Sequence, residues 1–124
     1  MTLDRPDLEG YGLLSDRAWA VLSLVETIPA GSVTTYGDIA AALGRGGPGS
    51  ARQVGQVMAR YGGGVPWWRV VNASGRVAPG HSATALARLA DEGCPLANGR
   101  VVLARARWRP LRPVDDVGST RADA

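Results

Sequence analysis

Apolar residues recur at helical spacing directly after Ser15, and this pattern predicts the first helix of the chain. The Ser15 hydroxyl can cap that helix, Asp16 suits its positive end, and Pro29 and Gly31 end it. Trp19 lies on the apolar stripe, so we expect it in the core. The complete stripe is Ala18, Trp19, Val21, Leu22 and Val25.

Two shorter helices are predicted next, each behind a capping signal. Val33-Thr34 is expected to be extended, and Thr35 to Asp38 matches a capping box that opens a helix to Leu43. The Gly-rich segment 45–49 must be a loop, and Ser50 to Gln53 is a second capping box, opening a helix to about Arg60. Two short helices joined by such a turn are typical of a helix-turn-helix, although many helical hairpins contact no DNA.

The second of these helices contains a glycine at mid-span. Val54 and Met58 share a face with Ala51, whereas Arg52, Gln53 and Gln56 point elsewhere. Gly55 costs a helix interior about 1 kcal/mol relative to Ala. Something is therefore expected to approach closely there: a neighbouring helix, which is the favoured explanation, or a nucleic-acid backbone.

The segment Val65 to Asn72, with its two adjacent tryptophans, is the least ordinary part of the sequence. A flexible link, residues 61–64, precedes it. Pro66 favours an extended conformation at Val65, which predicts a rigid, non-helical entry, and Val70-Val71 is expected to be a short buried run. The two indoles can be core residues or can line a pocket, where stacking on a nucleobase contributes about 1–3 kcal/mol. Residue chemistry favours the core for one of them and leaves the other open.

The remainder of the chain predicts a turn, a helix and a small wing. Residues 72–76 form the turn, and Ser82 is expected to cap a helix whose stripe is Leu86, Leu89 and Ala90, stopped at Gly93. Asn98-Gly99 is typical of a hairpin turn, so residues 96–108 are expected to form a two-stranded wing. Residues 1–14 are expected to be a flexible lead-in and 113–124 a flexible tail. The predicted fold is mostly α, a small α+β winged helix-turn-helix domain over residues 15–112.

Composition excludes several classes of function. The 124 residues suit one domain, and neither a membrane span nor a signal peptide is recognisable, so a cytoplasmic location is expected. With one cysteine and one histidine, Cys94 and His81, an intramolecular disulfide is impossible and a zinc site is not expected.

Charge is unevenly distributed along the chain. The formal net charge is only +3, but no acidic residue occurs between Asp38 and Asp91. Such segregation is typical of a face that contacts phosphates, although a solvated surface has the same pattern. The arginines inside this window are Arg45, Arg52, Arg60, Arg69, Arg76 and Arg88, and a second group comprises Arg100, Arg105, Arg107, Arg109 and Arg112.

These features together resemble the DNA-binding domain of the O6-alkylguanine-DNA alkyltransferases, and more closely their non-enzymatic branch, the alkyltransferase-like proteins, over roughly residues 15–112. The active-site motif of the enzymes is Pro-Cys-His-Arg-Val followed by Val or Ile, and this chain has Pro-Trp-Trp-Arg-Val-Val at 66–71. Trp67 stands at the position of the acceptor cysteine, as in the alkyltransferase-like proteins. The resemblance implies a lesion pocket that includes Trp67, Trp68, Arg69 and Val70.

Further matches imply a DNA-binding surface. Thr35-Tyr36 resembles the start of the family's helix-turn-helix, where the tyrosine helps to rotate the target nucleotide out of the duplex. Residues 51–55 resemble Ala-Arg-Ala-Val-Gly, which makes Arg52 the counterpart of the arginine that fills the gap in the base stack. Glu92 matches the glutamate of the enzymes' Cys-His-Glu relay. The implied DNA-binding residues are Thr35, Tyr36, Arg52, Gln53, Gly55, Arg60 and Arg76.

Departures from the family pattern exclude its chemistry. Trp68 occupies the position that is usually His, so the motif offers neither a nucleophile nor a base for alkyl transfer. Cys94 is expected to be a small apolar core residue rather than a substitute nucleophile. Residues 79–82 differ from the family's Tyr-Ser loop over the base pocket, and 62–64 replace a stretch that contains an asparagine in the enzymes. His81 is expected to sit in the loop without contacting DNA.

The resemblance implies DNA damage recognition without catalysis. In this hypothesis the chain binds O6-alkylguanine in duplex DNA by nucleotide flipping and flags it for nucleotide excision repair. It is expected to act as a monomer without metal or cofactor. The expected location is the cytoplasm, or the nucleoid of a bacterium. One alternative is a general or regulatory helix-turn-helix module whose base pocket is closed by Trp68. Another is an interaction protein for a peptide or small ligand.

Overall fold

The computed structural model describes residues 15–44 and 47–110, which form helices, 3-10 turns and two small sheets. This mostly helical α+β architecture is the predicted one. The predicted lead-in 1–14, the tail 113–124 and residues 45–46 of the loop lie outside the described residues. The elements in order are α2 (Asp16–Val25), β1 (Thr34–Thr35), α3 (Tyr36–Leu43), α4 (Ala51–Tyr61), η3 (Gly62–Gly64), η4 (Trp67–Arg69), β2 (Val70–Val71), α5 (Ser82–Asp91), β3 (Leu96–Ala97), β4 (Arg100–Val101) and α6 (Leu103–Ala106).

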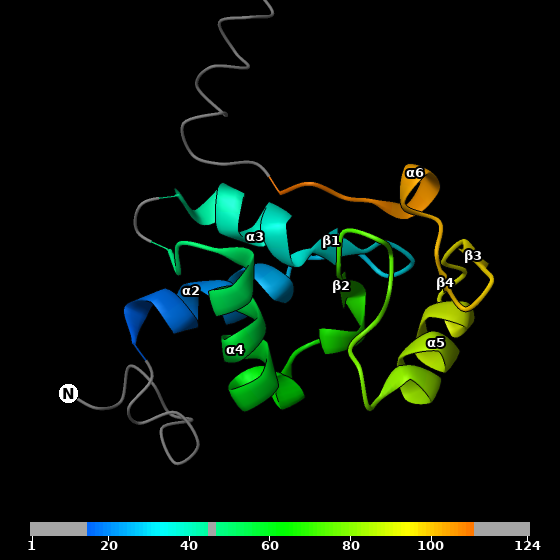
Figure 1. Cartoon of the computed structure of the whole chain (residues 1–124), viewed down its shortest axis with the longest axis horizontal. Helices are drawn as coiled ribbons and strands as arrows, with labels where there is room; N and C mark the ends of the chain where they lie inside the picture. The colour runs from blue at the N-terminus through cyan, green and yellow to red at the C-terminus, as the bar shows by residue number, and fades with distance from the viewer. Residues whose placement is uncertain (1–14, 45–46, 111–124) are drawn as a thin grey trace, which may run out of the picture.

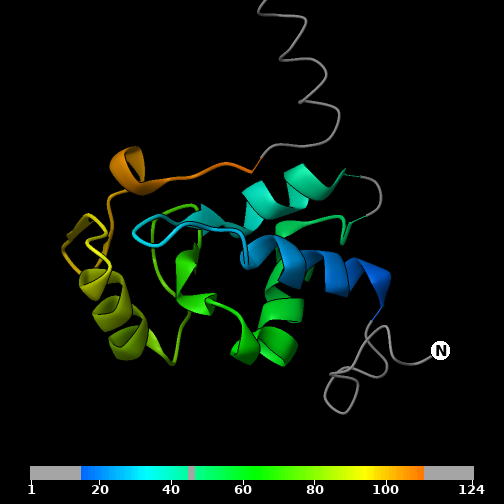
Figure 2. The ribbon, with the colours of Figure 1, turned by 180° about the vertical axis from the view of Figure 1, so that it is seen from behind.

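Two groups of elements lie on either side of a short central sheet. Figure 1 shows α2, α3 and α4 on one side and α5, α6 and the β3–β4 hairpin on the other, with β1 and β2 between them. The view from behind has the same division (Figure 2). β1 and β2 pair in parallel, with Thr34 opposite Val70 and Thr35 opposite Val71.

The alternation of side chains along β2 separates two hydrophobic clusters. Successive strand residues point to opposite faces, and Val70 belongs to the first cluster while Val71 belongs to the second. The predicted burial of this pair is confirmed. The first cluster is Ala18, Val21, Leu22, Val25, Ile28, Ile39, Val54, Val65 and Val70; the second is Val33, Val71, Val77, Ala85, Leu89, Cys94, Val101 and Ala106.

The first helix forms where the hydrophobic pattern predicts it. The Ser15 hydroxyl accepts a hydrogen bond from the Ala18 amide at 3.1 Å, which satisfies one of the free donors of the first turn. Trp19 is half-buried against the first cluster. The predicted stripe is therefore the side that α2 turns toward the core.

The capping box of α3 is confirmed. The Asp38 amide donates to the Thr35 hydroxyl at 3.0 Å, and the Thr35 amide donates to the Asp38 carboxylate at 3.5 Å. Asp38 also accepts two hydrogen bonds from Arg107, at 2.8 and 2.9 Å. Burial opposes ionisation of Asp38, but the bonds from Arg107 and Thr35 outweigh it and hold the pKa of this carboxyl below its usual value.

The start of α4 only partly matches its prediction. The Gln53 amide donates to the Ser50 hydroxyl at 3.2 Å, so Ser50 caps the helix. The Gln53 side chain does not return a bond to the Ser50 backbone. Its oxygen accepts from the Ser50 hydroxyl instead, at 3.5 Å, and the reciprocal half of the predicted box is absent.

The link between α4 and the tryptophans is ordered rather than flexible. Residues 62–64 continue α4 as a 3-10 turn, closed by a bond from the Val65 amide to the Gly62 carbonyl at 3.1 Å. Gly62 is buried, and a Cβ there would lie 3.0 Å from the Met58 methyl group. Close packing against Met58 therefore explains this glycine, where the sequence indicated only flexibility.

The tryptophans lie on a second 3-10 turn, so the predicted non-helical entry is wrong in part. Val65 is extended, as the following proline requires, with φ −122° and ψ 169°. Pro66 then begins η4 at φ −72°. The Pro66 carbonyl accepts from the Arg69 amide at 3.1 Å, which closes the turn.

α5 begins at Ser82, the predicted cap, and is therefore one residue earlier than expected. His81 is the N-cap and makes no capping bond through its side chain, so Ser82 is the first helical residue. Ala85 and Leu89 are the buried positions, whereas the predicted core residue Ala90 is exposed. Leu89 is buried and Leu86 packs against the second cluster, as predicted, so only Ala90 was misplaced, and Ala85 is buried instead.

The predicted wing is shorter than expected. Asn98 and Gly99 both have positive φ, 55° and 78°, as a tight hairpin turn requires. The second strand ends at Val101, and residues 103–106 form the short helix α6. The chain turns here because it returns to β1: the Val33 amide donates to the Ala106 carbonyl at 3.0 Å, and the Trp108 amide donates to the Val33 carbonyl at 2.7 Å.

Candidate nucleic-acid interface

The helix-turn-helix is formed by α3 and α4. Gly47 and Pro48 are buried in the connection between the two helices. A Cβ at Gly47 would lie 2.5 Å from that of Leu43, so the turn approaches the end of α3 too closely for any larger residue. The turn therefore holds the end of α3 and the approach to α4 close together at Gly47.

The solvent-facing side of α4 is polar and basic. Val54 is the buried residue of this helix and packs in the first cluster. Arg60 is exposed, with its guanidinium 5.5 Å from the centre of the Tyr61 ring. Among the described residues, none forms an ion pair with Arg52 or Arg60. We call the exposed residues Arg52, Gln53, Gln56 and Arg60 the α4 outer face.

Gly55 lies on α4 without a packing partner. A Cβ at this position would meet no other atom of the described residues within 4 Å. The prediction that packing against a neighbouring helix explains this glycine is therefore wrong. Packing within the described residues therefore gives no reason for the propensity cost of Gly55.

Thr35 and Tyr36 mark the start of α3, beside the central sheet. Thr35 is buried and its hydroxyl is used in the capping box. Tyr36 is half-buried and packs against the first cluster. Burial raises the pKa of the Tyr36 phenol, so the group remains a neutral hydroxyl at physiological pH.

The two tryptophans of η4 lie nearly perpendicular to each other. Their ring centroids are 5.8 Å apart with an interplanar angle of 86°. The Trp67 ring also meets the His81 ring at 5.8 Å and 64°. Both indoles are half-buried against the second cluster, so each combines a packed side with an accessible one.

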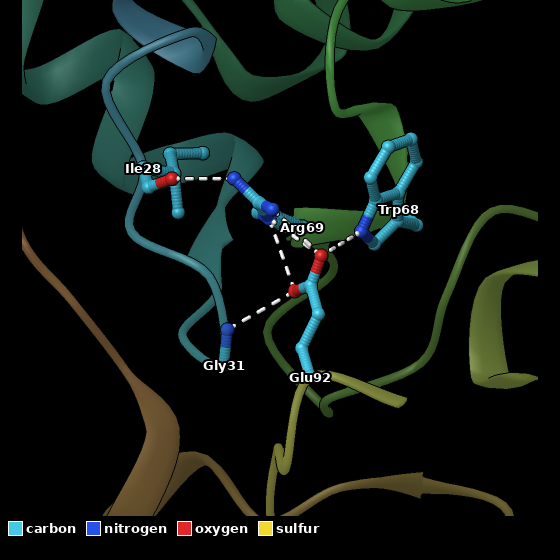
Figure 3. A network of polar contacts seen from close by, with 5 residues as sticks. All are labelled: Ile28, Gly31, Trp68, Arg69 and Glu92. Atoms are coloured by element: carbon cyan, nitrogen blue, oxygen red, sulfur yellow. Dashed lines mark hydrogen bonds and ion pairs between the residues drawn. The ribbon is translucent and has the colours of Figure 1, made fainter. Parts of the chain in front are cut away.

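Trp68 and Arg69 are fixed by Glu92, at the C-terminal end of α5. The Trp68 indole nitrogen donates to the Glu92 carboxylate at 2.9 Å, and Arg69 donates three bonds to it at 2.6, 3.0 and 3.2 Å (Figure 3). The same carboxylate accepts from the Gly31 amide at 3.0 Å, and Arg69 also donates to the Ile28 carbonyl at 2.8 Å. We call these five residues the Glu92 cluster.

The Glu92 cluster is a nearly closed ion pair. The Arg69 and Glu92 side chains are 16% and 15% exposed. Burial opposes ionisation of Glu92, but the bonds from Arg69, Gly31 and Trp68 outweigh it and hold the pKa of this carboxyl below its ordinary value. The Arg88 guanidinium lies 4.5 Å from the Trp68 ring centre and that of Arg69 lies 5.5 Å from it, so two cations contact the indole ring.

The predicted site residues therefore fall into different environments. Val70 is 1% exposed in the first cluster, and Arg69 is engaged by Glu92, whereas the α4 outer face and Arg76 are exposed. The β1–β2 pairing brings the Thr35 end of β1 next to the strand that follows the tryptophans. Residues that sequence reasoning did not assign to the site are Ile28, Gly31 and Arg88.

Neither a metal site nor a membrane-spanning helix is present among the described residues. Across 15–44 and 47–110, no three His, Cys, Asp or Glu side chains gather closely enough to bind a metal ion. In the same ranges, none of the helices has both the length and the apolar character needed to cross a bilayer.

Comparison with known proteins identifies relatives that span most of the chain. Residues 16–94 match the family described as the 6-O-methylguanine DNA methyltransferase DNA-binding domain. The DNA base-flipping protein of Escherichia coli is 40% identical over 97 residues, which span 74% of this chain and 71% of that protein. The DNA base-flipping protein of Vibrio parahaemolyticus is 33% identical over 95 residues, 73% of this chain and 93% of that protein.

Solved structures agree with the sequence relatives. A crystal structure of S. pombe Atl1 in complex with damaged DNA containing O6-carboxymethylguanine matches with a TM-score of 0.66 and 32% identity, over 77% of this chain and 96% of that one. A structure of S. pombe ATL in complex with DNA matches with a TM-score of 0.61 and 33% identity, over 75% and 94% of the two chains. The helix-turn-helix, the Pro-Trp-Trp-Arg turn and these matches together place the chain in the family of the 6-O-methylguanine DNA methyltransferase DNA-binding domain.

Proposed function

We propose that this chain recognises alkylation damage in DNA without repairing it. It binds O6-alkylguanine in duplex DNA by rotating the nucleotide out of the base stack, and the bound complex flags the lesion for nucleotide excision repair. The names of the relatives, DNA base-flipping proteins, and the damaged DNA bound to S. pombe Atl1 support this function.

The state of the single thiol is the observation that most strongly favours recognition over repair. Alkyl transfer needs a thiolate nucleophile, and Trp67 occupies the acceptor position. Cys94 is the only cysteine of the chain and is buried in the second cluster. Burial, and then the nearby charge of Glu92, raise the pKa of the Cys94 thiol, so the thiolate is disfavoured. Neither the Pro-Trp-Trp-Arg motif nor the buried Cys94 thiol is therefore suited to accept the alkyl substituent.

An indole at the acceptor position suits binding of a flipped base. The accessible side of Trp67 offers an apolar, stackable surface, and stacking of a base on an aromatic ring contributes about 1–3 kcal/mol. The hydrogen bond from Trp68 to Glu92 directs the indole nitrogen of Trp68 toward the end of α5. In this proposal Trp67 is a wall of the lesion pocket, and Trp68 fixes the turn that presents it.

The α4 outer face is the proposed contact with the duplex. Arg52 and Arg60 have no carboxylate partner among the described residues, so they are available to phosphates or to the base stack. Arg52 fills the gap left by the flipped nucleotide. The open surface at Gly55 allows a nucleic-acid backbone to approach the helix closely, and the Tyr36 hydroxyl crowds the phosphate on the 3′ side of the lesion.

Selectivity for the lesion arises partly before any contact with the alkyl group. Flipping a normal base costs a few kcal/mol in lost stacking and pairing, and a poorly paired base costs less. O6-alkylguanine pairs poorly, so a larger share of the binding free energy remains for affinity. The same protein is therefore expected to prefer the damaged duplex even if its pocket tolerates several alkyl groups.

The decisive experiment is a fluorescence-anisotropy titration of two duplexes that differ only in one O6-methylguanine, repeated across salt concentrations. Tighter binding to the damaged duplex is expected. Intact-protein mass spectrometry after the incubation should find no added methyl group. Equal, strongly salt-dependent binding would instead mean a general helix-turn-helix module whose pocket is closed, and no binding to either duplex would redirect the search to peptide or small-molecule ligands.

Two arginine variants of the same helix separate flipping from general affinity. Arg52→Ala is expected to remove most of the preference for the damaged duplex, because the gap in the stack is no longer filled. Arg60→Ala, its matched control, is expected to weaken binding to both duplexes equally. It should also lower the slope of log affinity against log salt by about 1. A preference that survives in Arg52→Ala would rule out the proposed role of this residue. We further propose a monomer, which sedimentation of the free chain and of the complex tests.

A further inference from the structure

A polar hollow lies away from α4, between the turn that follows β2, the start of α5 and the β3–β4 hairpin. Its volume is about 350 Å³, near the lower end of the range of about 300–1,000 Å³ typical of ligand sites. The polar side chains that line it are Arg76, Ser82, Asn98 and Arg100. Neither the tryptophan turn nor the α4 outer face contributes to its wall.

The positive charge in this hollow is not neutralised by the described residues. Neither Arg76 nor Arg100 forms an ion pair or a side-chain hydrogen bond with any of them. No carboxylate lines the hollow. On α5 the acidic residues stand at the opposite end from Ser82, about 14 Å away for a rise of 1.5 Å per residue. Two arginines that line one hollow repel each other through their charges, so an anion bound there would be stabilised by both.

The backbones that bear the two arginines are fixed to each other. The Asn72 side chain accepts from the Arg76 amide at 2.9 Å, which sets the turn after β2. The Val101 amide donates to the Gly75 carbonyl at 2.8 Å, and a Cβ at Gly75 would lie only 2.4 Å from the Val101 carbonyl oxygen. The segments preceding Arg76 and following Arg100 are therefore in direct backbone contact, and the arrangement exists before any ligand binds.

The donors around the hollow suit a phosphate group. Arginine binds phosphate through two parallel N–H bonds, and two arginines can engage different oxygens of one tetrahedral anion. Ser82 and Asn98, which also line the hollow, are residue types with neutral hydrogen-bond donors. The His81 side chain does not cap the first turn of α5. The backbone amides of that turn are therefore additional donors, although the site does not depend on them.

We propose that the hollow bounded by Arg76 and Arg100 is a phosphate-binding site, whose lining includes neither the residues 67–70 nor the α4 outer face. The phosphate belongs either to the backbone of the bound duplex or to a soluble phosphate compound. The existence of the site does not depend on lesion recognition, and only its assignment to duplex DNA rests on the proposed function.

Titration with inorganic phosphate tests the site without DNA. Amide resonances of Ser82, Gly99 and Arg100 in the folded chain are expected to shift saturably with phosphate, and not with sodium chloride at equal ionic strength. The double variant Arg76→Gln/Arg100→Gln is expected to abolish these shifts. The control Arg17→Gln/Arg105→Gln removes the same charge from two exposed positions outside the hollow and should retain them. Shifts that are absent, or that persist in the first double variant, would overturn the proposal.

Binding to undamaged duplex identifies the source of the phosphate. If a backbone phosphate occupies the hollow, the slope of log affinity against log salt should fall by about 2 in Arg76→Gln/Arg100→Gln, about 1 for each arginine, and stay unchanged in the control. An unchanged slope together with saturable phosphate shifts supports the site with a soluble ligand. An equal fall in both double variants would exclude a specific duplex contact in the hollow. If the chain binds no duplex, the proposed function fails while the phosphate titration still decides this inference.

Discussion

The Glu92 cluster and the α4 outer face both contain arginines, and they differ in whether the charge has a partner. Arg69 donates three hydrogen bonds to one carboxylate and a fourth to a backbone carbonyl, at 16% exposure. Arg52 and Arg60 are exposed and have no carboxylate partner among the described residues. An arginine satisfied within the protein stabilises the fold, whereas an unsatisfied one is available to an anionic partner.

The two regions also differ in how far apart in the sequence their interacting residues lie. Glu92 joins α5 to η4 and to the loop after α2, across sequence separations of 23 to 61 residues. The α4 outer face is a single helix surface whose position depends on the packing of Val54 beneath it. Changes in the Glu92 cluster should therefore alter stability first, and changes in the outer face should alter binding first.

Removing the carboxylate is expected to have the largest effect on stability. Glu92→Ala leaves the Arg69 guanidinium nearly enclosed without its charge partner and leaves the Trp68 and Gly31 donors unmet. The free energy of unfolding, measured by urea denaturation, should fall by about 2–4 kcal/mol. Asp91→Ala changes the exposed neighbour on the same helix and should alter it by less than about 0.5 kcal/mol. Equal stability of the two variants would mean that the Glu92 cluster does not stabilise the fold.

Removing a single donor from the Glu92 cluster should have an intermediate effect. Trp68→Phe retains an aromatic ring near Arg69 and Arg88 but loses the bond to a charged acceptor, which costs about 1–2 kcal/mol of unfolding free energy. Trp108→Phe is the matched control, because Trp108 packs against the first cluster and no described residue accepts from its indole nitrogen. If the two variants unfold at the same urea concentration, the indole–carboxylate bond contributes nothing.

Acid should weaken the same contacts more gradually. Glu92 and Asp38 both have pKa values below their ordinary values of 4.5 and 3.8. As the pH falls, the unfolded chain takes up protons at these groups before the folded chain does, so the folded state is disfavoured. Their contribution is complete above the ordinary pKa and is lost as the pH falls toward the lowered one. Urea midpoints between pH 7 and pH 3 should therefore decrease mostly below about pH 4.5, and less steeply in Glu92→Gln. A parallel decrease in that variant would exclude Glu92 as a source of the pH dependence.

The last prediction is a small gain in stability from a substitution at Gly55, within α4. Gly55→Ala adds a Cβ that meets nothing within the described residues, so the helix should gain about 0.5–1 kcal/mol from propensity alone. Duplex affinity should fall in the same variant if a nucleic-acid backbone approaches that point. Gly63→Ala, where a Cβ likewise meets nothing, is the control and should leave binding unchanged. Unaltered affinity in Gly55→Ala would exclude the close approach.

The helical part of the fold and half of the candidate site could be predicted from sequence. The capped helices, the hairpin turn and the buried Val70-Val71 pair follow from hydrogen bonds and periodicities within a few residues. The exposure of Arg52 follows from helical spacing in the same way. The resemblance at 66–71 identified the tryptophan turn, but not the environment of its two indoles.

One error is a local contact that the sequence did not reveal, and another arose where a distant segment replaced the local preference. Gly62 packs on Met58 instead of acting as a flexible link, and the wing ends at Val101 because the following residues bond back to Val33. The prediction for Gly55 was wrong in the opposite sense: a packing contact was expected, and none is present within the described residues.

The sequence by itself determined the short-range structure of this protein and the absence of a cysteine from residues 66–71. A capping hydroxyl, a turn glycine or a missing sulfur acts without reference to the rest of the chain. Only the tertiary structure decided which arginines are neutralised. Arg69 and Arg52 are both arginines in the same acid-free stretch, and a carboxylate 23 residues away pairs with one of them only. Charge pairing depends on distance in space, and that distance is set by the packing of the whole domain.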